Sequence, residues 1–282
     1  MMTGSEPVQR WGRIAGLSEE KINLAEAALV IASGEYPALD VDAYLERIED
    51  LAANLRRRLR PDIGTAESII ALNHYLFEEL RFTGDAAEYY DPRNSFLNEV
   101  IDRRMGIPIT LSLVYLEIGR RIGLALHGVS FPGHFLVKCV TRDGAIVLDP
   151  FAHGVSLSLD ELQQRVRRLR GGVGPAPEIV KSMLAAAGNR EILARMLRNL
   201  KAIYLHRSEP AKALATAHRI LALSPEAAGE FRDRGRIYLE LECFRAALGD
   251  FQHYLCLKPQ AADAGVIRAK VEELRNVTAR LN

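Results

Sequence analysis

The sequence contains no run of about 18 consecutive apolar residues, so we expect no membrane-spanning helix. Cysteine is scarce: Cys139, Cys243 and Cys256 are too few and too scattered for a disulfide framework or a zinc site. Residues 1–16 show neither an apolar segment nor a small-residue cleavage site. We therefore expect a cytoplasmic protein with reduced thiols, no membrane association and no cofactor.

The sequence also lacks an excess of charge of one sign, because 37 Lys and Arg residues face 36 Asp and Glu residues. Two short basic runs, at residues 56–60 and 165–170, close segments with helical apolar spacing. Cations there offset the negative end of a helix dipole and coat a solvated face. No aromatic residues alternate with them to stack on bases. We therefore expect no nucleic-acid binding.

The size and composition are those of a globular protein with two domains. The chain has 282 residues, of which 48% are hydrophobic and 26% charged. The segment rich in Gly and Pro at residues 171–177 is the best candidate linker. We place the boundary there, which gives an N-terminal domain at residues 1–175 and a helical domain at residues 178–282.

The N-terminal domain is predicted to be α+β. Helical apolar spacing recurs through the first 80 residues and begins with a helix over 18–33 that Ser18 caps. A helix over 109–122 is apolar nearly all round, which predicts burial. The sequence then alternates, and Arg142-Asp143-Gly144 predicts a hairpin turn. We expect helices around a core with a small antiparallel sheet, with strands at residues 129–131, 135–140 and 145–148.

The C-terminal part contains an internal repeat. A shift of 34 residues superposes Ile203-Tyr204-Leu205 on Ile237-Tyr238-Leu239, and Pro225 on Pro259. The pattern resembles tetratricopeptide repeats, which implies two helical repeats at 194–227 and 228–261 and a capping helix after them.

The first copy departs from this pattern. Lys201 stands where a small residue is expected, and Ala217 where an aromatic residue is expected. Because solenoid surfaces are concave, we expect a protein or peptide partner, with Tyr204 and Tyr238 among the binding residues. The alternative is that so short a stack only caps the core. The sequence does not indicate the oligomeric state.

Three strings in the middle of the chain suggest a catalytic layout: Gly106-Ile107-Pro108 opens the buried helix, Phe131-Pro132-Gly133-His134-Phe135 opens a strand, and Leu148-Asp149-Pro150-Phe151 ends the next one. A helix N-terminus, a histidine and then an aspartate on the neighbouring strand is the order of a Cys-His-Asp thiol site.

The stretch from Asn94 to Gly154 resembles the transglutaminase-like superfamily and, more closely, the bacterial Sir-B family, whose members join such a core to tetratricopeptide repeats. The resemblance covers about residues 20–261 and implies a transglutaminase- or papain-like fold. It assigns the catalytic histidine to His134 and the catalytic aspartate to Asp149. The cysteine position falls near Pro108 or Ile109, so the implied nucleophile is missing.

No nearby residue replaces that cysteine in an obvious way. Thr110 and Ser112 are close in sequence, but Ser112 lies more than a turn inside a buried helix. Cys139 is five residues after His134, which places it on the opposite face of the strand.

Three hypotheses remain for the pair of His134 and Asp149. It is a structural hydrogen bond, or part of a pocket that binds a ligand or peptide near Pro108. The third is residual hydrolase or acyltransferase chemistry on amide bonds, through Thr110 or Ser112, or through a metal held by His134, Asp149 and His153. The candidate walls of such a pocket are Asn94, Asn98, Tyr89, Tyr90, Thr110, Ser112 and Phe131. We expect a non-catalytic adaptor or regulatory protein, with the enzyme as the alternative.

Overall fold

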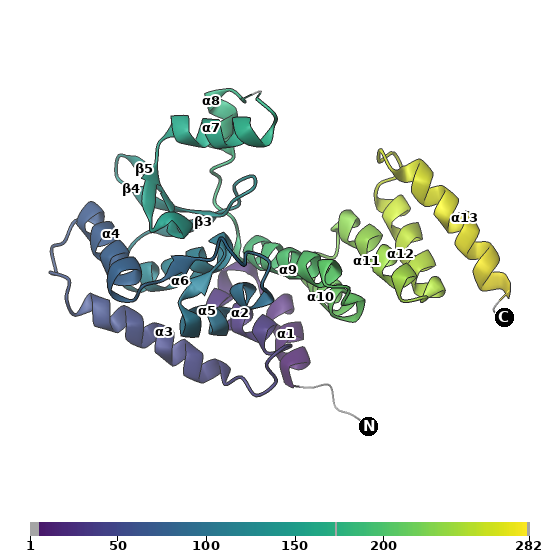
Figure 1. Cartoon of the computed structure of the whole chain (residues 1–282), viewed down its shortest axis with the longest axis horizontal. Coiled ribbons are helices and arrows are strands. Elements are labelled where there is room, and N and C mark those ends of the chain that lie inside the picture. The colour runs from purple at the N-terminus through teal and green to yellow at the C-terminus, as the bar shows by residue number, and fades with distance from the viewer. Residues whose placement is uncertain (1–5, 173, 281–282) are drawn as a thin grey trace. The chain divides into compact units, whose positions relative to one another are not determined.

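A computed structural model of the chain describes residues 6–172 and 174–280 (Figure 1). The chain divides into two compact units, Met1–Leu193 and Ala194–Asn282. The fold is α+β, as expected, with all the strands of the described residues in the first unit. The first unit extends to Leu193 and therefore includes residues 177–193. The domain boundary expected near residue 175, which divides the chain into 1–175 and 178–282, stays a prediction.

The first unit begins with a helical layer. Its helices are α1 (Glu6–Gly16), α2 (Leu24–Ala32), α3 (Val41–Arg56) and α4 (Thr65–Asn73), and α4 continues into the π-helical turn η2 (His74–Glu79). The helix expected from Ser18 begins later, because the side chain of Asn23 caps α2 by accepting from the backbone N–H of Glu26 at 3.0 Å. Ser18 instead precedes a single 3₁₀ turn, η1 (Glu19–Lys21).

The core helix α6 (Pro108–Arg121) follows a connecting segment made of short elements. That segment contains β1 (Thr83–Gly84), η3 (Pro92–Ser95), α5 (Leu97–Arg103) and β2 (Met105–Gly106), and β1 pairs in parallel with β2. Every residue of α6 from Pro108 to Gly119 is buried, which confirms the burial expected from its apolar surface. Pro108 occupies the first turn, where its missing N–H has no cost.

The sheet is a four-stranded antiparallel meander in the order β3-β4-β5-β6. Its strands are β3 (Leu126–Val129), β4 (Leu136–Thr141), β5 (Gly144–Asp149) and β6 (Val155–Leu157), with η4 (Pro150–Ala152) between the last two. Thr141 pairs with Gly144, so the expected hairpin turn is confirmed. The fourth strand, β6, was not expected from the sequence.

Two helices, α7 (Leu159–Leu169) and α8 (Pro177–Ser182), pack on one face of this sheet. The shared cluster consists of Val129, Phe131, Leu136, Val147, Leu162, Val166 and Val180. Arg167 and Arg168 of the second basic run lie on the exposed side of α7.

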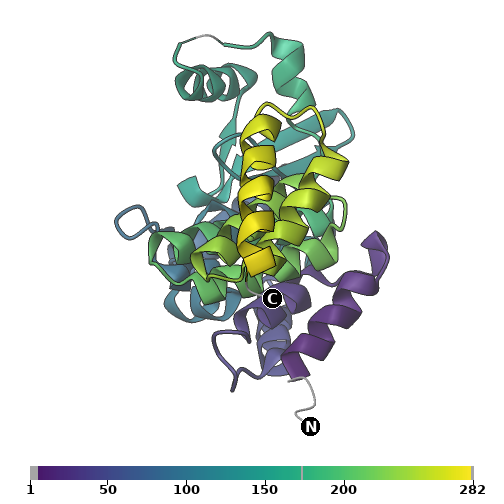
Figure 2. The ribbon, with the colours of Figure 1, turned by 90° about the vertical axis from the view of Figure 1, so that its right-hand side faces the viewer.

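The second unit is a stack of antiparallel helical pairs (Figure 2). Its helices are α9 (Asn189–His206), whose first residues belong to the first unit, α10 (Pro210–Leu223), α11 (Ala228–Glu240), α12 (Phe244–Leu257) and α13 (Ala264–Arg280). Gly235 of α11 approaches the ring of Phe251 so closely that a Cβ atom would lie 2.7 Å from it. This contact explains why the repeat pattern combines a small and an aromatic residue. Across residues 6–172 and 174–280, every helix is too short or too polar to cross a bilayer.

Candidate functional site

The structure brings His134 and Asp149 into contact. Asp149 ends β5, and His134 lies two residues before β4, the strand that pairs with β5 through Val137 and Leu148. The imidazole Nε2 of His134 lies 2.8 Å from Oδ1 of Asp149. The side chain of Asp149 is 2% exposed and that of His134 is 19% exposed, so solvent reaches the pair only from the imidazole side.

A tight turn orients the imidazole. The backbone N–H of His134 donates to the carbonyl of Phe131 at 3.1 Å, with Pro132 and Gly133 between them. Gly133 has φ +69°, the left-handed value that the third position of a type II turn requires. Leu169 of α7 packs on Gly133, where a Cβ atom would lie 2.8 Å from its Cδ1. The turn is therefore held in place by the helix that covers it.

Asp149 has a second partner, a cationic one, that the sequence did not reveal. Nη1 of Arg165 in α7 lies 2.8 Å from Oδ2 of Asp149, and the backbone N–H of Phe151 donates to Oδ1 at 3.2 Å. Burial alone would raise the pKa of Asp149, but the hydrogen bonds and charges of His134 and Arg165 outweigh it and lower the pKa. The carboxylate is therefore charged at neutral pH and holds both partners in fixed positions.

The basic run that contains Arg165 was interpreted as a solvated helix face. Arg165 lies beside the two buried residues of α7, Leu162 and Val166, and so borders the face that packs on the sheet. This position is the signal that could have identified Arg165 from the sequence.

A series of contacts leads from the pair to the short strand before α6. The ring of Phe151 stands 5.9 Å from the imidazole of His134, edge to face, and it also covers Gly84, where a Cβ atom would lie 2.5 Å from the ring. Gly84 pairs with Gly106, two residues before Pro108. The positions assigned to the missing nucleophile, Pro108 and Ile109, follow Gly106 in the chain, and their buried side chains have no reactive group.

The two hydroxyl groups near Pro108, those of Thr110 and Ser112, are buried. Thr110 Oγ1 accepts from the backbone N–H of Ile107 at 3.1 Å and donates to the carbonyl of Asn94 at 2.8 Å. The hydroxyl thereby caps α6. Ser112 is fully buried, and its Oγ has no hydrogen-bond partner within the described residues. Neither hydroxyl is exposed to a substrate in solution.

Cys139 is equally inaccessible. It is fully buried in β4 between its strand neighbours Leu126 and Ile146, and burial raises the pKa of its thiol. A thiolate is the reactive form, so this environment opposes nucleophilic chemistry.

Most of the residues proposed as pocket walls are buried. Asn94 is fully engaged: its amide donates to Asp85 Oδ2 at 3.0 Å and to the carbonyl of Glu88 at 2.8 Å, and its oxygen accepts from Arg103 at 3.2 Å. Phe131 belongs to the core cluster under α7, and Asn98 is buried in α5. Tyr89 and Tyr90 are exposed and form an edge-to-face pair. A binding role for these residues stays a prediction.

The metal hypothesis is not supported by the geometry. In the parts of the chain that the structure describes, no three His, Cys, Asp or Glu side chains are placed to hold a metal ion. His153 packs against the ring of Phe77 at 5.5 Å. The proposed set of His134, Asp149 and His153 is therefore contradicted.

The second unit contains a separate cavity of about 540 Å³. Its lining combines small residues at the start of α11 with polar and charged ones, and consists of Arg198, Ala227, Ala228, Gly229, Glu230, Arg232, Asp233, Tyr254, Lys258 and Ala261. The two tyrosines expected to bind a partner lie elsewhere. Tyr204 is buried, and the hydroxyl of Tyr238 lies 2.9 Å from Nε2 of His218.

Comparisons with known proteins agree with this two-part organisation. The profile of the transglutaminase-like superfamily matches residues 42–198, and a tetratricopeptide repeat profile matches residues 200–272. A UPF0162 protein of Xylella fastidiosa (strain Temecula1) is 40% identical over 266 residues, which cover 94% of this chain and 95% of that protein.

Two further relatives carry names. The UPF0162 protein YchA of Escherichia coli K12 is 30% identical and protein SirB1 of Salmonella typhimurium is 28% identical, each over 85% of this chain and 87% of its own length. Among solved structures, menin aligns with 96% of this chain and 73% of its own at a TM-score of 0.41 and 11% identity. So low a score carries no argument about fold or function.

Proposed function

Because the chain belongs to the SirB (UPF0162) family, with a transglutaminase-like core followed by tetratricopeptide repeats, we propose that it is a non-catalytic adaptor. It binds a protein or peptide partner through the repeats. The cytoplasmic location and the absence of a nucleic-acid partner expected from the sequence are part of this proposal.

The observation that carries the proposal is the cavity at the start of α11. Gly229 lines it, and a Cβ atom there would meet nothing within 4 Å, so the space beside the helix is open. Lys258, which also lines it, has no ion-pair partner within residues 6–172 and 174–280. An open space with a charged rim, between two repeats, suits a peptide with polar side chains.

The core supports a role without catalysis. Acyl transfer requires a nucleophile within hydrogen-bond reach of the base. The expected positions hold Pro108 and Ile109, Thr110 is committed to capping α6, and Cys139 is buried in the sheet. The double pairing of Asp149 with His134 and Arg165 instead holds β5, the turn before β4 and α7 together.

An enzyme acting on amide bonds is the second candidate. The 2.8 Å contact of His134 with Asp149 favours it, because that geometry orients an imidazole for proton transfer. Of the two hydroxyls that the sequence offers as nucleophiles near Pro108, that of Thr110 caps α6, and that of Ser112 has no partner within the described residues.

Affinity capture from the source cell with the full chain separates these functions. Gly229→Tyr fills the cavity and is expected to lose the captured partner. Gly265→Tyr is the matched control, since Gly265 in α13 is also open but does not line the cavity. His134→Ala is expected to retain the partner.

Other results would support the catalytic function instead. If the purified chain turns over amide substrates and His134→Ala or Ser112→Ala abolishes that turnover, the adaptor proposal fails. It also fails if Gly229→Tyr and Gly265→Tyr capture the same proteins in equal amounts.

A further inference from the structure

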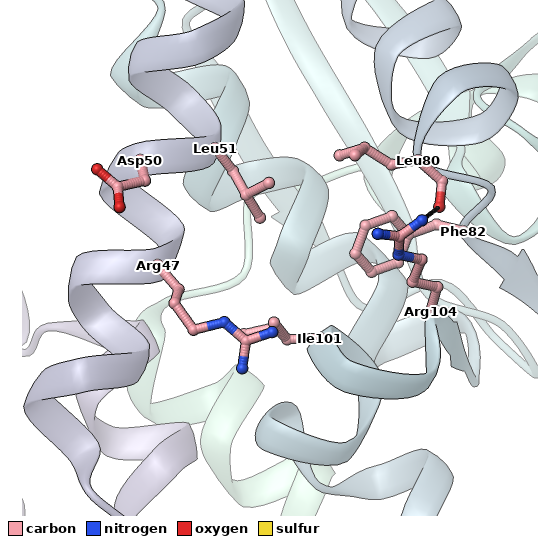
Figure 3. A pocket seen from close by; sticks show the side chains of 7 residues that line it. All are labelled: Arg47, Asp50, Leu51, Leu80, Phe82, Ile101 and Arg104. Carbon is pink, nitrogen blue, oxygen red and sulfur yellow. Dashed lines mark hydrogen bonds between the residues drawn. The ribbon is translucent and has the colours of Figure 1, made fainter.

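A small pocket opens on the first unit, and none of its lining residues belongs to the His134 site (Figure 3). It has a volume of about 180 Å³ and lies between α3, the C-terminal end of α5 and the chain from Leu80 to Phe82. Its floor is apolar, formed by Leu51, Leu80, Phe82 and Ile101. Its rim carries Arg47, Asp50 and Arg104.

Two arginines of the segments that border the pocket have a left-handed backbone conformation, but only one of them, Arg104, lines it. Arg104, the C-cap of α5, has φ +57°, and Arg81, between Leu80 and Phe82, has φ +59°. Glycine is the usual residue in this left-handed region, because a Cβ atom there crowds the following carbonyl oxygen. An arginine at such a position therefore supplies a guanidinium group that the usual glycine would lack.

Hydrogen bonds hold the charged rim in place without an external ligand. Nη1 of Arg104 donates to the carbonyl of Leu80 at 2.9 Å. Nη1 of Arg47 lies 2.6 Å from Oδ1 of Asp102, and its guanidinium stacks over the ring of Tyr44 at 4.8 Å. Both guanidinium groups are therefore positioned before a ligand arrives, which lowers the entropy cost of binding.

The rim presents positive charge to the apolar floor. Figure 3 shows Arg47 reaching from α3 toward Ile101 and Arg104 beside Phe82, whereas the carboxylate of Asp50 points away from the pocket. Asp102 compensates the charge of Arg47, but Arg104 has no carboxylate partner in the described ranges 6–172 and 174–280. A guanidinium with free N–H groups beside an apolar surface is complementary to a carboxylate with an apolar body.

From this arrangement we infer that the pocket binds a small free carboxylic acid with one apolar group. Its carboxylate receives hydrogen bonds from Arg104, and its apolar group covers Phe82 and Ile101. The volume is below the roughly 300–1,000 Å³ of sites for drug-sized ligands, so the occupant is a small molecule rather than a folded partner. The inference uses no residue of the repeats and is independent of the proposed adaptor function.

Titration of the full chain with 3-phenylpropionate tests the inference, with 3-phenylpropanamide as the neutral analogue. Methyl NMR signals of Leu51, Leu80 and Ile101 are expected to shift with the acid and not with the amide. Arg104→Gly is expected to weaken binding of the acid about tenfold or more, because a charge-assisted hydrogen bond is lost. The same change is expected to raise the Tm by about 2–4 °C, since it relieves the left-handed strain.

Arg81→Gly is the matched control. It relieves the same strain and removes a neighbouring positive charge, but Arg81 does not line the pocket, so affinity for the acid is expected to remain unchanged. A higher Tm of Arg104→Gly would show that this variant is folded, so that its weaker binding is not caused by unfolding.

Several results would overturn the inference: equal shifts with the acid and the amide, no shift at about 10 mM acid, or equal weakening by Arg81→Gly and Arg104→Gly. Tighter binding of a peptide with a free C-terminal leucine than of 3-phenylpropionate would assign the pocket to a chain terminus and overturn the free acid as occupant.

Discussion

The ammonium group of Lys201 lies 2.6 Å from Oε2 of Glu230, and both side chains are buried between the first and second repeats. Lys201 also contacts Asp233 at 2.9 Å, and Arg198 contacts the other oxygen of Glu230 at 2.7 Å. The residue that departs from the repeat pattern is therefore the centre of an ion-pair network between α9 and α11.

The two copies of the repeat show reversed sizes at equivalent positions. The second has the small Gly235 and the large Phe251, whereas the first has the large Lys201 and the small Ala217. Phe251 fills the space above Gly235, and Lys201 reaches the next repeat instead. The first copy thus exchanges an apolar contact within the repeat for a charged contact between repeats.

We expect Lys201→Met to destabilise the second unit by about 2 kcal/mol, because it leaves Glu230 buried with one partner fewer. Urea unfolding followed by far-UV circular dichroism measures this loss. The single tryptophan, Trp11, lies in the first unit, so its fluorescence follows that unit separately. Arg198→Met is the control and is expected to cost less than about 1 kcal/mol, since Arg198 is half exposed. An unchanged helical transition in Lys201→Met would contradict this interpretation.

Gly235→Ala is expected to destabilise the repeats by about 1–3 kcal/mol, because the new methyl group would overlap the ring of Phe251. Gly249→Ala in α12 makes the same change where nothing lies within 4 Å, so it is expected to be neutral or stabilising by up to about 1 kcal/mol. Thermal unfolding of both variants measures the difference. Equal Tm values for the two variants would show that the Gly235 contact is not tight.

The stability that Asp149 contributes is expected to depend on pH. Its pKa in the folded chain lies below the usual 3.8, so the contribution is fully present above that value and is lost as the pH falls through the lower folded pKa. The difference in unfolding free energy between the wild type and Asp149→Asn is therefore largest near pH 7, at about 2–4 kcal/mol, and decreases toward pH 3.

Urea midpoints of both proteins over this pH range test the prediction. Asp62→Asn, in the exposed turn before α4, is the control and is expected to show little difference at any pH. A difference between the wild type and Asp149→Asn that stays constant on acidification would exclude the ionised pair with Arg165 and His134 as its source.

Local pattern predicted several elements well. The apolar surface of α6, the turn of Arg142-Asp143-Gly144 and the repeat period each depend on residues close together in the chain, and the structure confirms all three. The predicted start of α2 at Ser18 was wrong, because Ser18 and Asn23 are both acceptable N-caps and only packing selects between them.

The environments of single polar groups were harder to predict. Thr110 was a candidate nucleophile, but its hydroxyl bonds to Asn94, sixteen positions earlier in a different element. Arg165 was assigned to solvent, but its partner Asp149 lies on a strand that α7 covers. Helical spacing gives the direction of a side chain from its own helix and does not indicate what lies opposite.

By itself, the sequence determined the order of the two parts, the period of the repeats, the pair of His134 and Asp149, and the absence of cysteine at residues 108 and 109. These are properties of residue identity and short-range periodicity. Only the tertiary structure decided that Arg165 shares Asp149 with His134, that Lys201 reaches Glu230, and that Arg47 and Arg104 flank one apolar pocket. Such pairings depend on which elements pack together, and burial of apolar surface selects that packing without regard to distance along the chain.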